Sequence, residues 1–353
     1  MIFSSWEFIF IFLPICFLGY FYLIENQHIN GGKVWLILCS LFFYGYWKVD
    51  YLLIILFSII INFSLGTYLS RKLVSQKRIN RKICLIFGIF FNIFLLGYFK
   101  YLNFIVENIE KFTLLKFELP EIILPLAISF FTFQQIAYLV DSYKRTTIKY
   151  EFLNYILFVT FFPQLIAGPI VHHKEMISQF DSKKNLIPQE KNLTIGLFLF
   201  SIGFFKKLAI ADVFAIWADK GFLASLNLNM YEAWITSLSY TFQLYFDFSG
   251  YCDMAMGLAY LFNIKLPLNF NSPYKAFDIQ DFWRRWHITL GRFLRDYIYI
   301  PLGGNRSKEI GTYFNIFITF IIGGIWHGAS WMFMIWGLLH GLSLVIFRFW
   351  KKI

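Results

Sequence analysis

Long apolar runs without formal charge most strongly limit how this chain can fold. The longest extends from Ile310 to Phe347 and contains no Asp, Glu, Lys or Arg. Five more such runs cover 8–24, 51–70, 83–99, 122–140 and 152–173. A helix of about 20 apolar residues crosses the hydrocarbon core of a bilayer, where the backbone must form its hydrogen bonds internally. The pattern therefore predicts an all-α, polytopic transmembrane helical protein.

The composition supports this class and excludes several others. Of the 353 residues, 58% are hydrophobic and 15% are charged, whereas soluble domains have about 25% charged residues. So few charges rule out an ordinary cytosolic enzyme, a disordered regulator and a nucleic-acid binder with a basic surface. Shorter apolar stretches cover 34–47, 193–205, 233–246 and 254–264. With them we expect about nine or ten membrane-embedded helices, joined by short loops into one membrane domain over residues 1–353.

The basic residues predict the orientation of the chain in the membrane. The net charge is +11, the first 32 residues contain no Lys or Arg, and the densest early cluster lies at 71–82. Lys and Arg prefer the cytoplasmic side, so counting spans back from that cluster places the N-terminus outside. The first apolar run lacks signal-peptide features and is expected to remain as a span. Later clusters expected inside lie at 183–184, 206–207, 284–308 and 348–352.

The cysteines and histidines show no metal-binding pattern. The four cysteines, Cys16, Cys39, Cys84 and Cys252, lie in or beside apolar runs and form no C-x-x-C pair. Small core residues are therefore expected, not ligands or disulfides. His340 follows His327 by 13 positions, which would separate them by about 140° on a continuous helix. No metal site is predicted.

Asp247 and Asp253 lie inside or at the end of an apolar segment. Ionisable groups inside a membrane need partners and often have functions. One interpretation is that each carboxylate pairs with a Lys or Arg and holds helices together. The other is that both support a functional site, and the sequence leaves the two open.

His327 lies in the middle of the charge-free run 310–347. Gly323, Gly324 and Gly328 surround it, and they would let a ligand or another backbone come close. The run is expected to break into two short spans near Gly323-Gly324. A neutral histidine there can act as general base for a hydroxyl. The alternative is a core histidine bonded to a carbonyl.

The segment 281–298 is amphipathic if it is helical throughout. One face carries four arginines, the opposite face carries Trp and Phe side chains, and His287 falls on the border; the arginines are Arg284, Arg285, Arg292 and Arg295. Such helices lie in the membrane interface. The arginines are expected to contact either lipid phosphates or the phosphates of an anionic donor such as coenzyme A, because Arg binds phosphate bidentately.

Two prolines predict interrupted helices in the middle of the chain. Pro163 and Pro169 lie inside the run 152–173, and Asp141 follows the run 122–140. These features favour broken or re-entrant segments, which a membrane tolerates where they line a cavity. The neighbouring pair His172-His173 receives no role from the sequence.

Several motifs together resemble the membrane-bound O-acyltransferase family, in the branch with the membrane subunits of alginate and peptidoglycan O-acetylation. The resemblance covers nearly the whole chain. The C-terminal motifs are FDFSGY at 246–251, DFWRRWHITLGRFLRDYI at 281–298 with PLGGNR at 301–306, and WHGASW at 326–331. The earlier ones are LPLAISFFTFQ at 124–134, YLVDSY at 138–143, FFPQLIAGPI at 161–170 and GFFKK at 203–207.

The resemblance implies a fold, an activity and a site. The family fold is a ring of tilted helices around a tunnel, with short re-entrant and interfacial helices on the cytoplasmic side. An acyl thioester, acetyl-CoA or an acyl carrier protein, would enter from the cytoplasm of a bacterium. The acyl group, most simply acetyl, would pass to hydroxyls of a cell-surface polysaccharide across the inner membrane, directly or through a secreted or periplasmic acetyltransferase or esterase-like partner. No bound cofactor and no nucleic-acid partner are implied.

The resemblance also assigns roles to residues. His327 corresponds to the catalytic histidine and His287 to the second polar residue of the site. Donor binding is expected from Trp283, Arg284 and Arg285. Support for the site is expected from Asp247, Asp253, Trp326 and His340.

Two other functions stay open from the sequence. The first is a transporter for a glycan or lipid intermediate, with the histidines as proton-relay or gating groups. The second is an inactive, truncated membrane scaffold for a periplasmic acetyltransferase, since family members usually continue with further spans beyond the point that corresponds to Ile353. Peptidoglycan, alginate and other polysaccharides all stay open as acceptors.

Overall fold

A computed structural model describes residues 1–71, 78–113, 116–117, 122–146, 150–182, 185–224 and 227–353. Helices and loops without strands make up these residues, which confirms the all-α class. Basic residues of the expected cytoplasmic clusters that lie outside the described residues are Lys72, Lys77, Lys183 and Lys184. The chain forms two compact units, Met1–Val49 with Leu153–Asn269 and Asp50–Phe152 with Phe270–Ile353. A single family domain over 1–353 stays a prediction.

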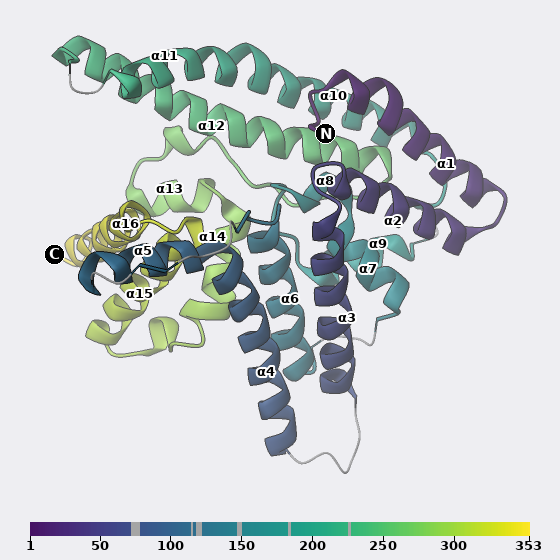
Figure 1. Cartoon of the computed structure of the whole chain (residues 1–353), viewed down its shortest axis with the longest axis horizontal. Helices are drawn as coiled ribbons and strands as arrows, with labels where there is room; N and C mark the ends of the chain where they lie inside the picture. Colours follow the sequence, from purple (N-terminus) through teal and green to yellow (C-terminus); the bar gives the residue numbers. More distant parts are fainter. Residues whose placement is uncertain (72–77, 114–115, 118–121, 147–149, 183–184, 225–226) are drawn as a thin grey trace. The chain divides into compact units, whose positions relative to one another are not determined.

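The first unit is built around the long helix α12 (Met230–Leu261), which packs against α10 (Glu190–Phe205) and α11 (Asp212–Leu223) (Figure 1). Its other helices are α1 (Leu13–Glu25), α2 (Ile29–Gly45), α7 (Phe152–Thr160), α8 (Phe162–Leu165) and α9 (His173–Phe180). Glycines let α10 and α12 come close, because a Cβ added to Gly203 would lie 2.5 Å from the Gly250 carbonyl oxygen. The two stretches 233–246 and 254–264, expected as separate helices, are thus largely one continuous helix.

The second unit begins with three neighbouring helices, α3 (Asp50–Ser70), α4 (Arg78–Leu96) and α6 (Ile128–Tyr143) (Figure 1). A π-helical turn at Gly97–Tyr101 connects α4 to α5 (Leu102–Thr113). The remaining helices are α13 (Ile279–Arg285), α14 (Ile288–Leu294), α15 (Glu309–His327) and α16 (Trp331–Trp350), with a π-helical turn at Arg295–Tyr299.

Buried polar side chains join α3, α4 and α6. The Gln135 Oε1 atom accepts hydrogen bonds from Ser58 Oγ (2.6 Å) and Asn62 Nδ2 (2.5 Å), and Asn92 Nδ2 donates to Asn62 Oδ1 at 2.6 Å. Helix association in lipid has no hydrophobic driving force of its own, so packing and hydrogen bonds between helices contribute more. These hydrogen bonds therefore help to specify how the three apolar helices pack.

Six helices or helix pairs among the described residues are long and apolar enough to cross a membrane. They cover Phe8–Glu25, Asp50–Ser70, Asn80–Thr113, Glu190–Leu223, Glu309–His327 and Trp331–Trp350. The chain is therefore a multi-pass membrane protein, as expected. The expected nine or ten embedded helices also included shorter ones, of which Ile29–Gly45 is apolar but has fewer residues than a full span.

The run 152–173 does not form one span. Helix α7 ends at Thr160, Phe161 has an extended ψ of 107°, and the four-residue α8 follows with Pro163 in its first turn. Proline lacks a backbone N–H and interrupts a helix except near its start. This interruption agrees with the broken segment expected from Pro163 and Pro169. The four cysteines are free thiols, and three of them, Cys16, Cys39 and Cys252, are buried, as expected of core residues.

Candidate active site

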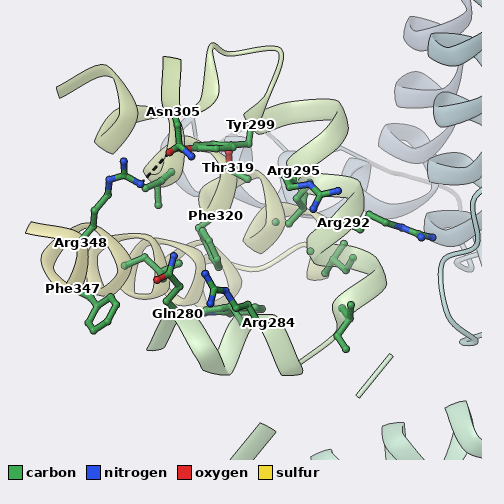
Figure 2. Close-up of a pocket in the computed structure, with 18 of the residues that line it drawn as sticks. Gln280, Arg284, Arg292, Arg295, Tyr299, Asn305, Thr319, Phe320, Phe347 and Arg348 are labelled. Carbon is green, nitrogen blue, oxygen red and sulfur yellow. Dashed lines mark hydrogen bonds between the residues drawn. The ribbon is translucent and has the colours of Figure 1, made fainter. Parts of the chain in front are cut away.

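A cavity of about 720 Å³ lies within the second unit, among α13, α14, α15 and α16 (Figure 2). Its lining combines apolar and aromatic side chains with basic ones. It contains three of the residues expected at a site, His327, Trp283 and Arg284. Polar groups that converge in an apolar cavity are the usual mark of a small-molecule site.

The expected continuous helix over 281–298 is wrong. Helix α13 ends at Arg285, Trp286 is extended, and His287 has the left-handed backbone angles φ 44° and ψ 52° before α14 begins. The Asn271 N–H donates to the Arg285 carbonyl oxygen at 2.9 Å, so a preceding segment takes a bond that a longer helix would have used. Trp286 and His287 lie outside the right-handed α region, so the regular rotation of about 100° per residue is interrupted there. The helical wheel therefore does not apply across Trp286-His287.

His287 is buried, not placed at the border of two faces. Its side chain is 2% exposed and packs between the Phe270 and Trp326 rings, with centroids 6.4 Å and 6.2 Å away. Burial, and secondarily the nearby His327 ring, lower the pKa of His287 to about 3 from its ordinary 6.5. The imidazole is therefore neutral at physiological pH.

The lowered pKa of His287 predicts how stability depends on pH. The folded protein keeps this imidazole neutral down to about pH 3, whereas the unfolded chain binds a proton below about pH 6.5. Protons then favour unfolding, so stability should fall as the pH decreases from about 6.5 towards 3. Thermal unfolding in detergent between pH 4 and 7 should show a shallower decline for His287→Asn, since asparagine tolerates positive φ. Equal slopes for both proteins would contradict this assignment.

His327 is the last residue of α15, and its ring lines the cavity. Its Nε2 atom is buried and has no hydrogen-bond partner among the described residues. The ring packs against Trp336 and Trp326, with centroids 4.6 Å and 5.1 Å away. A buried polar atom without a partner costs free energy, so this nitrogen is available to a ligand. The alternative of a core histidine with Nε2 satisfied by a carbonyl is not what the structure shows.

The break in the run 310–347 lies later than expected. Helix α15 continues through Gly323 and Gly324 and ends at His327; Gly328 is extended, and Ser330 Oγ caps α16 by accepting from the Met332 N–H. A Cβ on Gly324 would lie 2.4 Å from the Phe333 carbonyl oxygen and 3.0 Å from Gly337 Cα. The glycines thus serve a close backbone contact between α15 and α16 without breaking the helix.

Trp283 and His340 complete an aromatic cluster around His327. The His340 ring lies 4.7 Å from Trp336 and 5.0 Å from Trp283, centroid to centroid. The expected angle of about 140° between His327 and His340 assumed one continuous helix. The break after His327 places His327 on α15 and His340 on α16, and both imidazole rings pack against Trp336. The Trp283 Nε1 atom is buried without a partner among the described residues. Trp326 stacks on Phe133 at 5.0 Å and supports the same cluster.

Basic side chains surround the cavity, and among the described residues that line it none is acidic. The basic ones are Arg284, Arg292, Arg295, Arg348, Lys351 and Lys352. Figure 2 shows Arg348, whose Nη1 donates to Asn305 Oδ1 at 3.1 Å. Arg285 does not line the cavity and instead pairs with Asp281 at 2.9 Å. The sequence pattern indicated only a role in topology for the cluster 348–352, and these residues were not predicted to line a cavity.

Lys100 was also missed. Its Nζ donates to the carbonyl oxygens of Trp326 and His327. The signal was present in the sequence, since Lys100 directly follows the run 83–99 and carries a charge into a membrane-spanning helix. Asp247 and Asp253 lie in the other unit, where Lys207 Nζ is 2.6 Å from Asp247 and Lys206 Nζ is 2.5 Å from Asp253. They have the basic partners expected from one of the two interpretations.

Comparison with known proteins identifies the family of this chain. Residues 148–353 match the model of MBOAT, the membrane-bound O-acyltransferase family. The chain is 51% identical to the peptidoglycan O-acetyltransferase of Helicobacter pylori and 41% identical to a probable alginate O-acetylase of Pseudomonas aeruginosa. Both matches cover 99% of this chain, and 70% and 66% of those relatives. It is 28% identical to the teichoic acid D-alanyltransferase of Bacillus subtilis over 64% of the chain and 60% of that relative. The chain therefore belongs to the membrane-bound O-acyltransferase family.

Proposed function

We propose that this chain transfers an acyl group, most simply acetyl, from a thioester donor to hydroxyls of a cell-surface polysaccharide. The observation that carries the proposal is the unpartnered Nε2 of His327 in a cavity surrounded by basic side chains. The relatives named for acetylation of peptidoglycan and alginate support the acceptor class.

His327 acts as the general base in this proposal. Its neutral Nε2 accepts the hydroxyl proton while the hydroxyl oxygen attacks the thioester carbonyl carbon. The resulting intermediate collapses, the C–S bond breaks, and the imidazolium returns the proton to the departing thiolate. An ester and a free thiol are formed, so atoms and charge balance. The unpartnered Trp283 N–H can donate a hydrogen bond to the carbonyl oxygen of the donor. The neutral His287 packs against Trp326, which in turn packs against His327, and through this contact it orients the reacting groups.

The basic side chains of the cavity bind the donor. Coenzyme A and the prosthetic group of an acyl carrier protein both carry phosphate, which guanidinium groups bind bidentately. Arg284 and Arg348 lie on two different helices that line the cavity, and the Arg348 Nε is buried without a partner among the described residues. Arg285 contributes by holding α13 through Asp281. Lipid phosphates would meet the exposed arginines outside the cavity.

The family and the charge distribution support a location for the reaction. We place the chain in the inner membrane of a bacterium, with its basic clusters and donor cavity on the cytoplasmic side and its N-terminus outside. The acyl group leaves on the outer side through the tunnel of the family fold, to the polysaccharide or to a periplasmic acetyltransferase partner. Asp247, Asp253, Trp326 and His340 have supporting roles.

Charge reversal in the cavity tests donor binding. Arg284→Glu combined with Arg348→Glu should raise the KM for acetyl-CoA by about 100-fold or more while changing kcat little, because each lost phosphate contact removes about 1.5–3 kcal/mol of binding. The measurement is transfer of labelled acetyl groups to polysaccharide in membranes that contain the protein. Lys174→Glu, at an exposed position of α9, is the matched control. An unchanged KM in the double variant, or labelling that needs no thioester, would contradict the proposal.

A further inference from the structure

Lys100 is a basic residue within a helical stretch that is long and apolar enough to cross the membrane. It lies in the π-helical turn Gly97–Tyr101, within the span Asn80–Thr113. Charged residues in apolar, membrane-embedded segments are costly and rare unless they are paired. In the part of the chain that the structure describes, no carboxylate lies within ion-pair distance of its Nζ. All the groups of the described residues that accept hydrogen bonds from this amine are neutral. Burying the amine without a carboxylate costs free energy, so its position calls for a structural or functional reason.

Those contacts are concentrated on the end of α15. The Lys100 Nζ donates to the Trp326 carbonyl oxygen, to the His327 carbonyl oxygen at 3.3 Å and to Ser129 Oγ at 3.2 Å. It also lies 5.6 Å from the centroid of the Trp326 ring. Its neighbour Tyr101 donates its hydroxyl to the Ile325 carbonyl oxygen at 2.5 Å. Three successive carbonyl groups are thus satisfied by two adjacent side chains.

The end of a helix needs such partners. The last four carbonyl groups of an α-helix have no N–H partner within the helix. Helix α15 ends at His327, because Gly328 has an extended backbone. In a membrane, water is not present to satisfy them. A cation also complements the negative end of the helix dipole. Lys100 therefore fixes the terminal turn that holds His327, although among the described residues it forms no hydrogen bond with the imidazole ring.

We infer that Lys100 is a positioning residue for His327: by binding the carbonyl oxygens of Trp326 and His327, it holds the imidazole in the cavity with Nε2 directed to the reacting hydroxyl. This inference rests on the proposed function, because it needs His327 as the base. A wide π-helical turn of this kind often occurs at functional sites. Here it places Lys100 and Tyr101 against neighbouring carbonyl groups of the same helix end.

Four variants test this role in purified protein with an acetyl thioester donor. Lys100→Met keeps the length of the side chain and removes its donors; kcat should fall by about 10²-fold, as expected for a misplaced catalytic group, with KM for the donor within about threefold of the wild type. Lys100→Arg keeps the charge and the donors and should recover most of that loss. Tyr101→Phe, which removes one bond to Ile325, should cost less than Lys100→Met. Ser129→Ala removes only the third contact and should stay within about twofold.

The double variant His327→Gln with Lys100→Met separates the two proposals. If Lys100 acts through His327, the double variant should be no slower than His327→Gln alone, because residues that act as a unit are not additive. A kcat of Lys100→Met within twofold of the wild type, while His327→Gln is inactive, would overturn the role of Lys100 only. Full activity of His327→Gln would overturn the proposed function instead. A further variant, Lys100→Gln, keeps a polar side chain at this position. If neither Lys100→Met nor Lys100→Gln folds, Lys100 stabilises the helix end in general, and the positioning role is overturned.

Discussion

Replacement of His327 by glutamine should lower kcat for acyl transfer by about 10²–10⁴-fold, the usual contribution of a general base. Glutamine has nearly the size of histidine and can form a hydrogen bond, but it cannot take up the proton of a hydroxyl. The change should act on kcat, while the KM for the thioester stays close to that of the wild type, because the basic side chains of the cavity are unchanged. Single-turnover transfer of labelled acetyl groups, with the amount of folded protein checked, measures the loss.

His28→Gln is the matched control for that experiment. His28 is exposed at the start of α2, so its replacement changes the same chemical group outside the cavity. It should leave kcat unchanged. A His327→Gln protein that turns over at the rate of the His28→Gln protein would remove His327 from the chemistry of the reaction.

Replacement of Lys206 by methionine should destabilise the protein by about 1–3 kcal/mol, the cost of leaving the partly buried Asp253 carboxylate without its hydrogen-bonding partner. Lys206 Nζ lies 2.5 Å from Asp253, and the two side chains are 25% and 15% exposed. Burial raises the cost because the carboxylate cannot be solvated in place of its lost partner. The free energy of unfolding in denaturant, measured on protein in detergent, gives this value.

Two further variants test the cause of that destabilisation. Lys206→Met combined with Asp253→Leu should recover most of the lost stability, since it removes both charges. Lys207→Met should cost less than Lys206→Met, because the side chains of Lys207 and its partners Asp212 and Asp247 are 31%, 45% and 51% exposed and are therefore less desolvated. If Lys206→Met and Lys207→Met cost the same, burial is not the reason for the effect.

The class of fold could be predicted from the sequence because a bilayer permits few solutions for an apolar chain. Runs such as 51–70 and 310–347 contain spanning helices, and Pro163 marks an interruption. Helix ends were less predictable. The break at His287 depends on a positive φ and on a hydrogen bond from Asn271 to the Arg285 carbonyl, and neither has a local signature in the sequence. The wheel of 281–298 failed for that reason.

The candidate site was found in part. The motif around His327 and the aromatic Trp283 pointed to residues that share one cavity. Lys100 and Arg348 could not be placed at the site from the sequence, because their contacts join residues that are far apart in the chain. Lys100 lies 227 positions from His327, whose carbonyl oxygen it binds. A single sequence without its fold does not show which distant helix end a membrane lysine satisfies.

The close contact of α15 with α16 at Gly324 and Gly337 has a consequence for how such a site can diversify. No side chain separates the two backbones there, so almost any substitution would push the helices apart. The glycine positions in the part of the cavity wall that carries His327 and Trp336 therefore tolerate few substitutions. New acyl groups or donors would have to be accommodated by substitutions elsewhere in the lining, at apolar side chains of α14 such as Ile288 and Leu290.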